Sequence, residues 1–221
     1  MNIPASTFNF LKALKENNNR EWFNDNKETY EKARQNFIEF AQLILDGLSK
    51  LDKRIPGDLP ASKCVYRIYR DIRFSKDKTP YKGYLSAAYS VTGRSTVLPG
   101  YYVHIEPGKS FVTAGLWHPR KEKLAAIRQE IDYNSENFHA IIDKLQSTGY
   151  VLDQEDRLKK APSGYAIDHP DIEFLRLKSF TISQSYKDQV LLNDNADSKI
   201  LETIAALQPF QEFLYAAISD S

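Results

Sequence analysis

Hydrophobic positions in the first fifty residues recur at three- and four-residue steps, which is typical of amphipathic helices. Ser6 or Thr7 can cap a short first helix, which ends at three successive asparagines because asparagine favours turns. A long second helix is predicted over residues 20–51, where one apolar stripe alternates with charged positions. The segment 55–60 contains two prolines, which cannot continue a helix.

The centre of the chain changes to a two-residue period, which indicates half-buried strands. Residues 84–91 alternate in this way, and residues 100–119 are predicted to form a hairpin that turns at Pro107 and Gly108. The connections are too short for crossover helices, so antiparallel pairing is expected. One face of the first hairpin strand should carry Tyr101, Val103 and Ile105, and the other should carry Tyr102, His104 and Glu106.

Helical patterning returns after Pro119, and a last helix is predicted from about Asp197 to Ile218, with a kink at Pro209. Residues 150–195 show a mixed pattern. We therefore predict an α+β protein in which long N-terminal and C-terminal helices pack on a central antiparallel sheet with a β-hairpin. A single domain over residues 1–221 is expected, made of a helical part (1–55), a β part (62–118) and a mostly helical part (119–221).

Composition narrows the class of protein. The chain has 221 residues, of which 42% are hydrophobic and 12% aromatic, as expected for a globular protein and not for a disordered one. Its single cysteine, Cys64, closes no intrachain disulfide and is interpreted as a buried apolar residue. The chain has neither a signal-peptide pattern nor an apolar run long enough for a membrane span, so we expect a cytoplasmic protein without a membrane partner.

Positive charge is concentrated between Lys63 and Lys82, where seven cations face two aspartates and give a local charge of +5 in a chain of net charge +1. A strand over residues 67–73 followed by a loop would present Arg, Lys, Ser and backbone N–H groups together, a combination that suits a phosphate or carboxylate. A second basic group consists of Lys159, Lys160, Arg176 and Lys178, and Lys159 and Lys178 could complete the same anion pocket. The candidate ligand-binding residues are Arg67, Arg70, Asp71, Arg73, Ser75, Lys76, Lys78, Tyr81, Lys82, Lys159 and Lys178.

Two other functions fit the same stretch. The Arg and Asp side chains could form an internal network that fixes the fold or a partner-binding surface. Aromatic residues also interleave with the cations, as in a nucleic-acid-binding groove, but the net charge of +1 disfavours this class. We therefore expect a site for a small anionic ligand, with a structural or partner-binding role as the first alternative and nucleic-acid binding as the second; whether the protein is an enzyme stays open.

Acid–base and metal chemistry point to the hairpin. Asp71, His104 and Glu106 are the candidate catalytic residues, with His104 and Glu106 on one strand face beside the basic stretch. If Pro107 and Gly108 form the tip, His104 faces Phe111 and His118 points away, which disfavours a metal site built from the histidines and Glu106. We therefore predict neither a metal nor a cofactor.

The stretch RDIRFSKDKTPYK resembles the signature of a widespread family of uncharacterised bacterial and fungal proteins with a domain of unknown function. The resemblance extends to the aromatic N-terminal helices, to YYVHIEPG and GLWHP in the hairpin, and to LKKAPSGY, DHP and LRLKSF towards the C-terminus. It implies that the basic stretch is a feature of the family. It brings no activity, substrate or catalytic residue with it.

Overall fold

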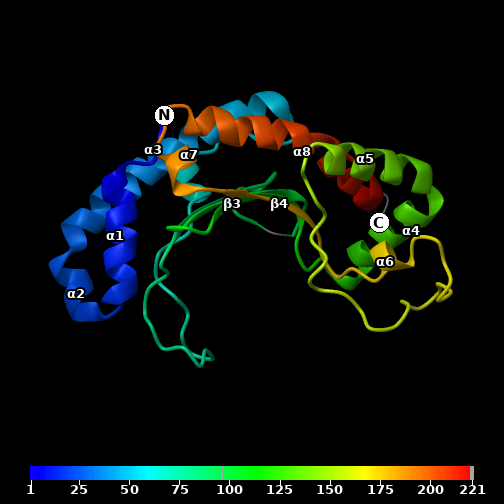
Figure 1. Cartoon of the computed structure of the whole chain (residues 1–221), viewed down its shortest axis with the longest axis horizontal. Coiled ribbons are helices and arrows are strands. Elements are labelled where there is room, and N and C mark those ends of the chain that lie inside the picture. Colours follow the sequence, from blue (N-terminus) through cyan, green and yellow to red (C-terminus); the bar gives the residue numbers. More distant parts are fainter. Residues whose placement is uncertain (96, 220–221) are drawn as a thin grey trace.

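The computed structural model describes residues 1–95 and 97–219 (Figure 1). Its centre is a four-stranded antiparallel sheet in the order β1-β2-β3-β4, which confirms the predicted α+β class and the antiparallel pairing. The strands are β1 (Leu85–Tyr89), β2 (Gly100–Ile105), β3 (Ser110–Leu116) and β4 (Phe180–Tyr186).

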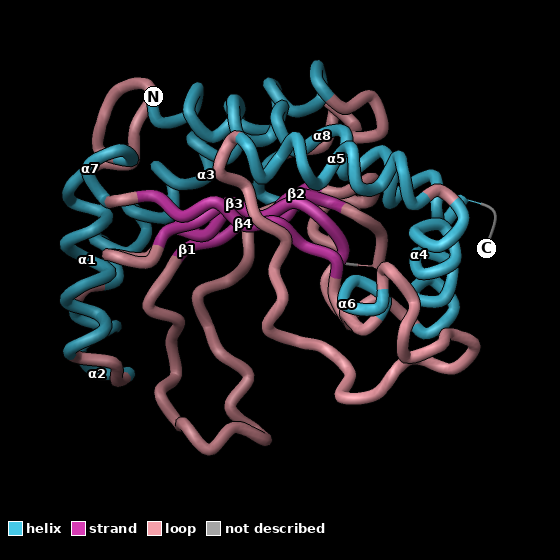
Figure 2. The backbone as a smooth tube through the Cα atoms, turned by 45° about the vertical axis from the view of Figure 1, so that its right-hand side comes forward, coloured by secondary structure: helices cyan, strands magenta, loops and turns pink. Residues whose placement is uncertain are grey.

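Helices cover one face of this sheet. The long helices α3 and α8 lie across that face, whereas loop segments of the described chain border the other face (Figures 1 and 2). The helices are α1 (Ala5–Glu16), α2 (Arg20–Asp25), α3 (Lys27–Leu51), α4 (Lys121–Tyr133), α5 (Ser135–Ser147), α6 (Ile172–Leu175), α7 (Asp188–Leu191) and α8 (Ala196–Ser219), with a 3₁₀ turn η1 (Ala61–Lys63).

Side chains alternate across the sheet as the sequence predicted. Tyr101, Val103 and Ile105 of β2 are buried on the helix-covered face, where they join apolar residues of α3 and α8 in the core. Tyr102 and His104 lie on the other face, and His104 pairs in register with Phe111 of β3. Because neighbouring residues of a strand point to opposite faces, one register fixes which side chains reach the open face.

A divided helix and an additional strand are among the features that differ from the sequence prediction. The long helix expected over residues 20–51 is divided at Asn26, whose side-chain amide donates to the carbonyl of Trp22. Asparagine competes in this way for backbone groups and interrupts helices. The strand β4 is the second difference, because it lies in a segment whose mixed pattern did not predict a strand.

Two long segments extend from the open side of the sheet (Figure 1). The first, here called the basic arm, comprises residues 66–84 and is drawn in teal. Its two limbs run antiparallel through an isolated bridge between Tyr69 and Tyr81, so the strand expected over residues 67–73 is instead an irregular extended limb. The second segment, residues 150–179, lies beside β4, where Leu152 bridges Ile182.

No helix in the described part of the chain is both long and apolar enough to cross a membrane.

Candidate functional site

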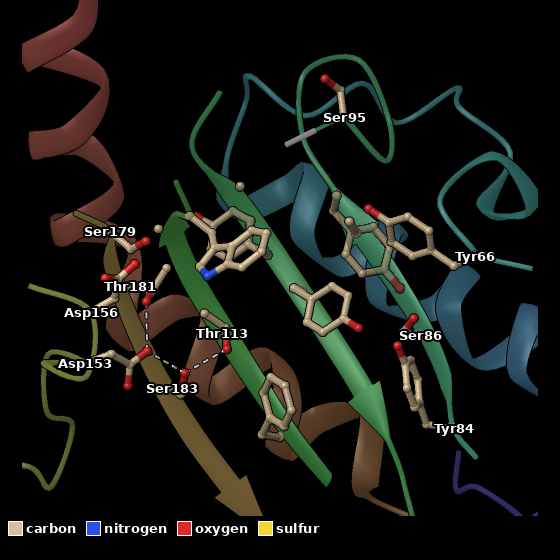
Figure 3. A pocket seen from close by; sticks show the side chains of 18 of the residues that line it. Tyr66, Tyr84, Ser86, Ser95, Thr113, Asp153, Asp156, Ser179, Thr181 and Ser183 are labelled. Carbon is tan, nitrogen blue, oxygen red and sulfur yellow. Dashed lines mark hydrogen bonds between the residues drawn. The ribbon is translucent and has the colours of Figure 1, made fainter. Parts of the chain in front are cut away.

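A cavity of about 760 Å³ opens on the face of the sheet that the helices leave uncovered (Figure 3). We call it the sheet-face cavity. Its floor includes Tyr102, Thr113 and Ser183, which are register partners on β2, β3 and β4. The cavity therefore uses the outward-facing positions of successive strands, and strand pairing determines its lining.

Two paired glycines lower part of this floor. Gly100 of β2 and Gly115 of β3 are register partners, and both line the cavity. A Cβ atom at Gly100 would lie 2.6 Å from the carbonyl oxygen of Tyr89, so close backbone packing leaves no room for a side chain there. The floor is therefore lowest where the neighbouring strands β2 and β3 both lack a side chain.

One end of the cavity is aromatic and positively charged. Lys82 lines it together with Tyr66 and Tyr84, and the Lys82 ammonium lies 5.3 Å and 5.8 Å from the centroids of their rings. Burial and, to a smaller extent, the nearby Arg67 lower the pKa of Lys82. Among residues 1–95 and 97–219, no carboxylate forms an ion pair with this half-buried ammonium.

The opposite end carries carboxylates and hydroxyls. Asp153 accepts hydrogen bonds of 2.8 Å from the hydroxyls of Thr181 and Ser183, and the Ser183 hydroxyl also lies 2.8 Å from that of Thr113 (Figure 3). Asp156, which also lines this end, forms an ion pair with Lys178 at 2.7 Å. The cavity is therefore polarised, with a cation at the β1 side and carboxylates beside β4.

A chain of three polar side chains runs along the open face of β2. The hydroxyl of Tyr102 lies 3.3 Å from Nδ1 of His104, and Nε2 of His104 lies 3.1 Å from Oε2 of Glu106. His104 is only 7% exposed, and burial lowers its pKa while Glu106 opposes that shift. The two hairpin candidates for acid–base chemistry thus contact each other, and Tyr102 connects them to the cavity.

The tip of the basic arm is organised by its own ion pairs. Arg70 donates to Asp77, to the Thr79 hydroxyl and, at 3.4 Å, to Ser75. The exposed pair of Arg73 and Asp71 has N–O distances of 2.9 Å and 2.6 Å. These side chains fold the tip back on itself and do not line the cavity.

The other predicted ligand-binding residues are distributed between the arm, the cavity and the surface. Tyr81 is buried and stacks on Phe23, with ring centroids 3.9 Å apart. Of the eleven candidates only Lys82 lines the cavity, while Lys178 contacts it indirectly through Asp156. The structure places Arg67, Lys76, Lys78 and Lys159 at exposed positions.

Several residues that line the cavity were not predicted as site residues from the sequence. The alternation placed Tyr102 on the same face as His104, but neither Tyr102 nor Trp117 was named as a site residue, because neither is charged. Asp153 lies in an irregular segment without periodicity, and only its position beside β4 brings it to the cavity. His118 lies against Asp156 at 3.2 Å and away from His104, and the described residues contain no cluster of three or more potential His, Cys, Asp or Glu metal ligands.

Replacing Arg70 tests how the arm tip is held. A backbone hydrogen bond from Thr79 and then the side chain of Arg70 lower the pKa of Asp77 to about 2 from an ordinary value of 3.8. Stabilisation from this carboxylate is therefore present above pH 3.8 and is lost as the pH falls through about 2. We expect Arg70→Ala to raise the pKa of Asp77 towards 3.8, measured by carboxyl NMR titration, and to increase proteolytic cleavage within residues 71–79 at neutral pH.

Arg73→Ala is the matched control, because Arg73 forms its ion pair with Asp71 and not with Asp77. It should leave the titration of Asp77 unchanged. An unchanged Asp77 pKa in Arg70→Ala would show that Arg70 does not hold the tip.

The fold and the cavity together define an α+β protein whose antiparallel sheet is covered by helices on one face and hollowed on the other. The chain belongs to the family of conserved hypothetical proteins DUF2461, whose family model matches residues 6–213. Comparison with curated proteins found no match, and comparison with solved structures found none either.

Proposed function

We propose that the protein binds a small organic molecule in the sheet-face cavity and that Lys82 binds an anionic group of this ligand, a phosphate or a carboxylate. The observation that carries the proposal is the half-buried ammonium of Lys82, which lines the cavity without an ion-pair partner in the described chain. A buried charge is costly unless it is paired. An incoming anion would supply the missing partner through a charge-assisted hydrogen bond.

The rest of the lining suggests what accompanies the anionic group. Aromatic rings near Lys82 offer flat apolar surfaces, whereas Asp153 and Glu155 at the other end offer hydrogen-bond acceptors. Adjacent strands lie about 4.8 Å apart, so the four strands span roughly 14 Å. A volume of about 760 Å³ is in the range typical of ligand pockets. A ligand with an anionic end, a flat or ring-shaped body and a hydroxyl- or amine-bearing end matches this lining.

The arm supports the alternative functions less well. The aromatic residues that interleave with the cations are Tyr66, Tyr69, Phe74 and Tyr81. Two of them have other contacts, because Tyr81 is buried against Phe23 and Tyr66 lines the cavity. Only Phe74 at the tip is almost fully exposed, at 95%. The Arg70 and Arg73 ion pairs favour a structural role for the tip itself, which is compatible with a binding site at Lys82.

A thermal-shift screen tests the proposal. Purified protein is heated with phosphate, sulfate, dicarboxylates, sugar phosphates, nucleotides and short oligonucleotides at low and high salt. A ligand at a hundred times its Kd adds roughly 2.7 kcal/mol to the free energy of unfolding, which corresponds to about 5–10 °C in Tm for a chain of this size. We expect such a shift with at least one small anion, and Lys82→Met should weaken its binding by about 10- to 100-fold.

Lys76→Met is the matched control, because Lys76 is exposed on the same arm and outside the cavity. Lys82→Met should fold well, since burial already disfavours the charged ammonium in the folded state. A shift that survives in Lys82→Met but disappears in Lys76→Met would place the anion on the arm and refute the proposal. A shift with oligonucleotides alone, lost at high salt, would favour nucleic acid instead.

A further inference from the structure

The chain of hydrogen bonds along β2 ends at a hydroxyl in the sheet-face cavity. Tyr102, His104 and Glu106 are alternate residues of one strand and the turn that follows it, so strand geometry places their side chains in a row on the same face. Tyr102 lines the cavity, whereas His104 is buried. Glu106 is half-buried, and its carboxylate lies 3.7 Å from the ammonium of Lys15 in α1.

The partners of His104 determine its tautomer. An ionised carboxylate can only accept hydrogen bonds, so Nε2 of His104 carries the proton that is donated to Glu106. Nδ1 then has a free lone pair, which accepts the proton of the Tyr102 hydroxyl. The order of the chain is a hydroxyl, an imidazole that accepts its proton, and a carboxylate that orients the imidazole. This is the arrangement that activates hydroxyl groups in catalysis.

Packing fixes the imidazole in this position. The ring of His104 lies between Phe111, with centroids 4.6 Å apart at 16°, and Tyr84, with centroids 4.2 Å apart. The charged and titratable groups that face the chain are Lys15 at Glu106, Tyr84 at His104, and Tyr66 and Tyr84 at Tyr102. Burial raises the pKa of Tyr102 to about 12, although a hydrogen bond with Ser86 opposes this shift, so the hydroxyl keeps its proton until His104 removes it.

We propose that Tyr102 is a catalytic residue that takes a proton from a hydroxyl group of an anionic ligand, with His104 and Glu106 as positioning residues. The ligand O–H bond breaks and its proton moves to the Tyr102 oxygen, while the Tyr102 proton moves to Nδ1 of His104. The ligand keeps the electron pair as an alkoxide, and the carboxylate of Glu106 stabilises the imidazolium. The substrate class is a hydroxylated phosphate or carboxylate, which rests on the proposed binding function through Lys82.

Benzenesulfonyl fluoride tests the activation of Tyr102 without a known substrate. The tyrosine oxygen bonds to sulfur, the S–F bond breaks, fluoride leaves with the electron pair, and the phenolic proton passes to His104. The probe is uncharged, so its reaction does not require anion binding, and failure of the two proposals can be distinguished. Modification of each tyrosine is followed by peptide mass spectrometry between pH 5 and 9.

Tyr102 should react about 100-fold faster than Tyr133, which is 82% exposed and provides the reactivity of an ordinary tyrosine. It should also react faster than Tyr66 and Tyr84, which line the same cavity and control for access. The rate at which benzenesulfonyl fluoride modifies Tyr102, here called the Tyr102 rate, should fall at acidic pH, below the ordinary histidine pKa of 6.5. A protonated His104 cannot accept a proton. Lys76→Met should leave these rates unchanged.

Variants separate positioning from mere packing. His104→Phe should reduce the Tyr102 rate to that of Tyr84. Glu106→Gln changes a half-buried side chain and should preserve folding. Glu106 raises the pKa of His104, so His104 in this variant should become protonated at lower pH. The pH at which the rate of Tyr102 modification falls should therefore also be lower. A Tyr102 rate no greater than that of Tyr133 in the wild-type protein, or a pH profile that Glu106→Gln does not move, would overturn the proposal.

Discussion

Gly115→Ala is expected to lower the free energy of unfolding by about 3 kcal/mol and to damage the sheet-face cavity. Gly115 has φ 134°, a conformation that L side chains rarely adopt. A Cβ atom there would also lie 2.8 Å from Cα of Thr181 and inside van der Waals contact with the carbonyl oxygen of Phe180. Both obstacles are backbone atoms of β4, so β3 and β4 would have to separate where they form the cavity floor.

Denaturant unfolding of the variant measures this loss, and two further glycines separate its causes. Gly108→Ala introduces a side chain at φ 74° into open space, so it measures the conformational cost alone. Gly83→Ala has open space and no positive φ, and should change stability little. A Gly115→Ala variant no less stable than Gly108→Ala would show that the close approach of β4 is not a real constraint.

Phe138→Ala is expected to lower the free energy of unfolding by about 3–5 kcal/mol. Phe138 of α5 is fully buried, with ring centroids 5.0 Å from Phe174 in α6 and 5.2 Å from Phe213 in α8. Truncation would remove the contact that joins these three helices and leave a cavity between them. Phe138 lies among the helices and does not line the sheet-face cavity. Anion binding by the variant molecules that remain folded should therefore persist.

Tyr133→Ala is the control, because Tyr133 is an aromatic residue at the end of the adjacent helix α4 and is 82% exposed. Its loss should change stability by about 0.5 kcal/mol or less. Equal effects of the two substitutions on urea-induced unfolding would contradict the packing described for α5.

Periodicity predicted the parts of the fold that depend on one buried face. The alternation in residues 100–119 assigned Tyr102 and His104 to the open face, and the register between His104 and Phe111 followed from the turn at Pro107 and Gly108. Helix α8 was predicted because its apolar stripe is long. Strand β4 was not predicted, although Phe180 and Ile182 alternate with polar residues, because this alternation is short and lies in a segment with several loop signals.

Charge density along the sequence located the basic arm but not the contacts that its charged residues form. It could not show that Arg70 forms an ion pair with Asp77, or that Lys82 is the one candidate ligand-binding residue that lines the cavity. Local pairing depends on a loop conformation that periodicity does not encode. Asp153 reaches the cavity through contacts with Thr181 and Ser183, which are 28 and 30 residues further along the chain, and no local pattern predicts these contacts.

The central claim is that Lys82 binds the anionic group of a small ligand in the sheet-face cavity. The most direct test is a crystal structure of the protein with the tightest-binding small anion from the thermal-shift screen. We expect an anionic oxygen within about 3.2 Å of Nζ of Lys82 and the body of the ligand against the aromatic lining. An anion bound instead at the tip of the basic arm, beside Arg73 and Lys76, with the cavity free of ligand, would contradict the account.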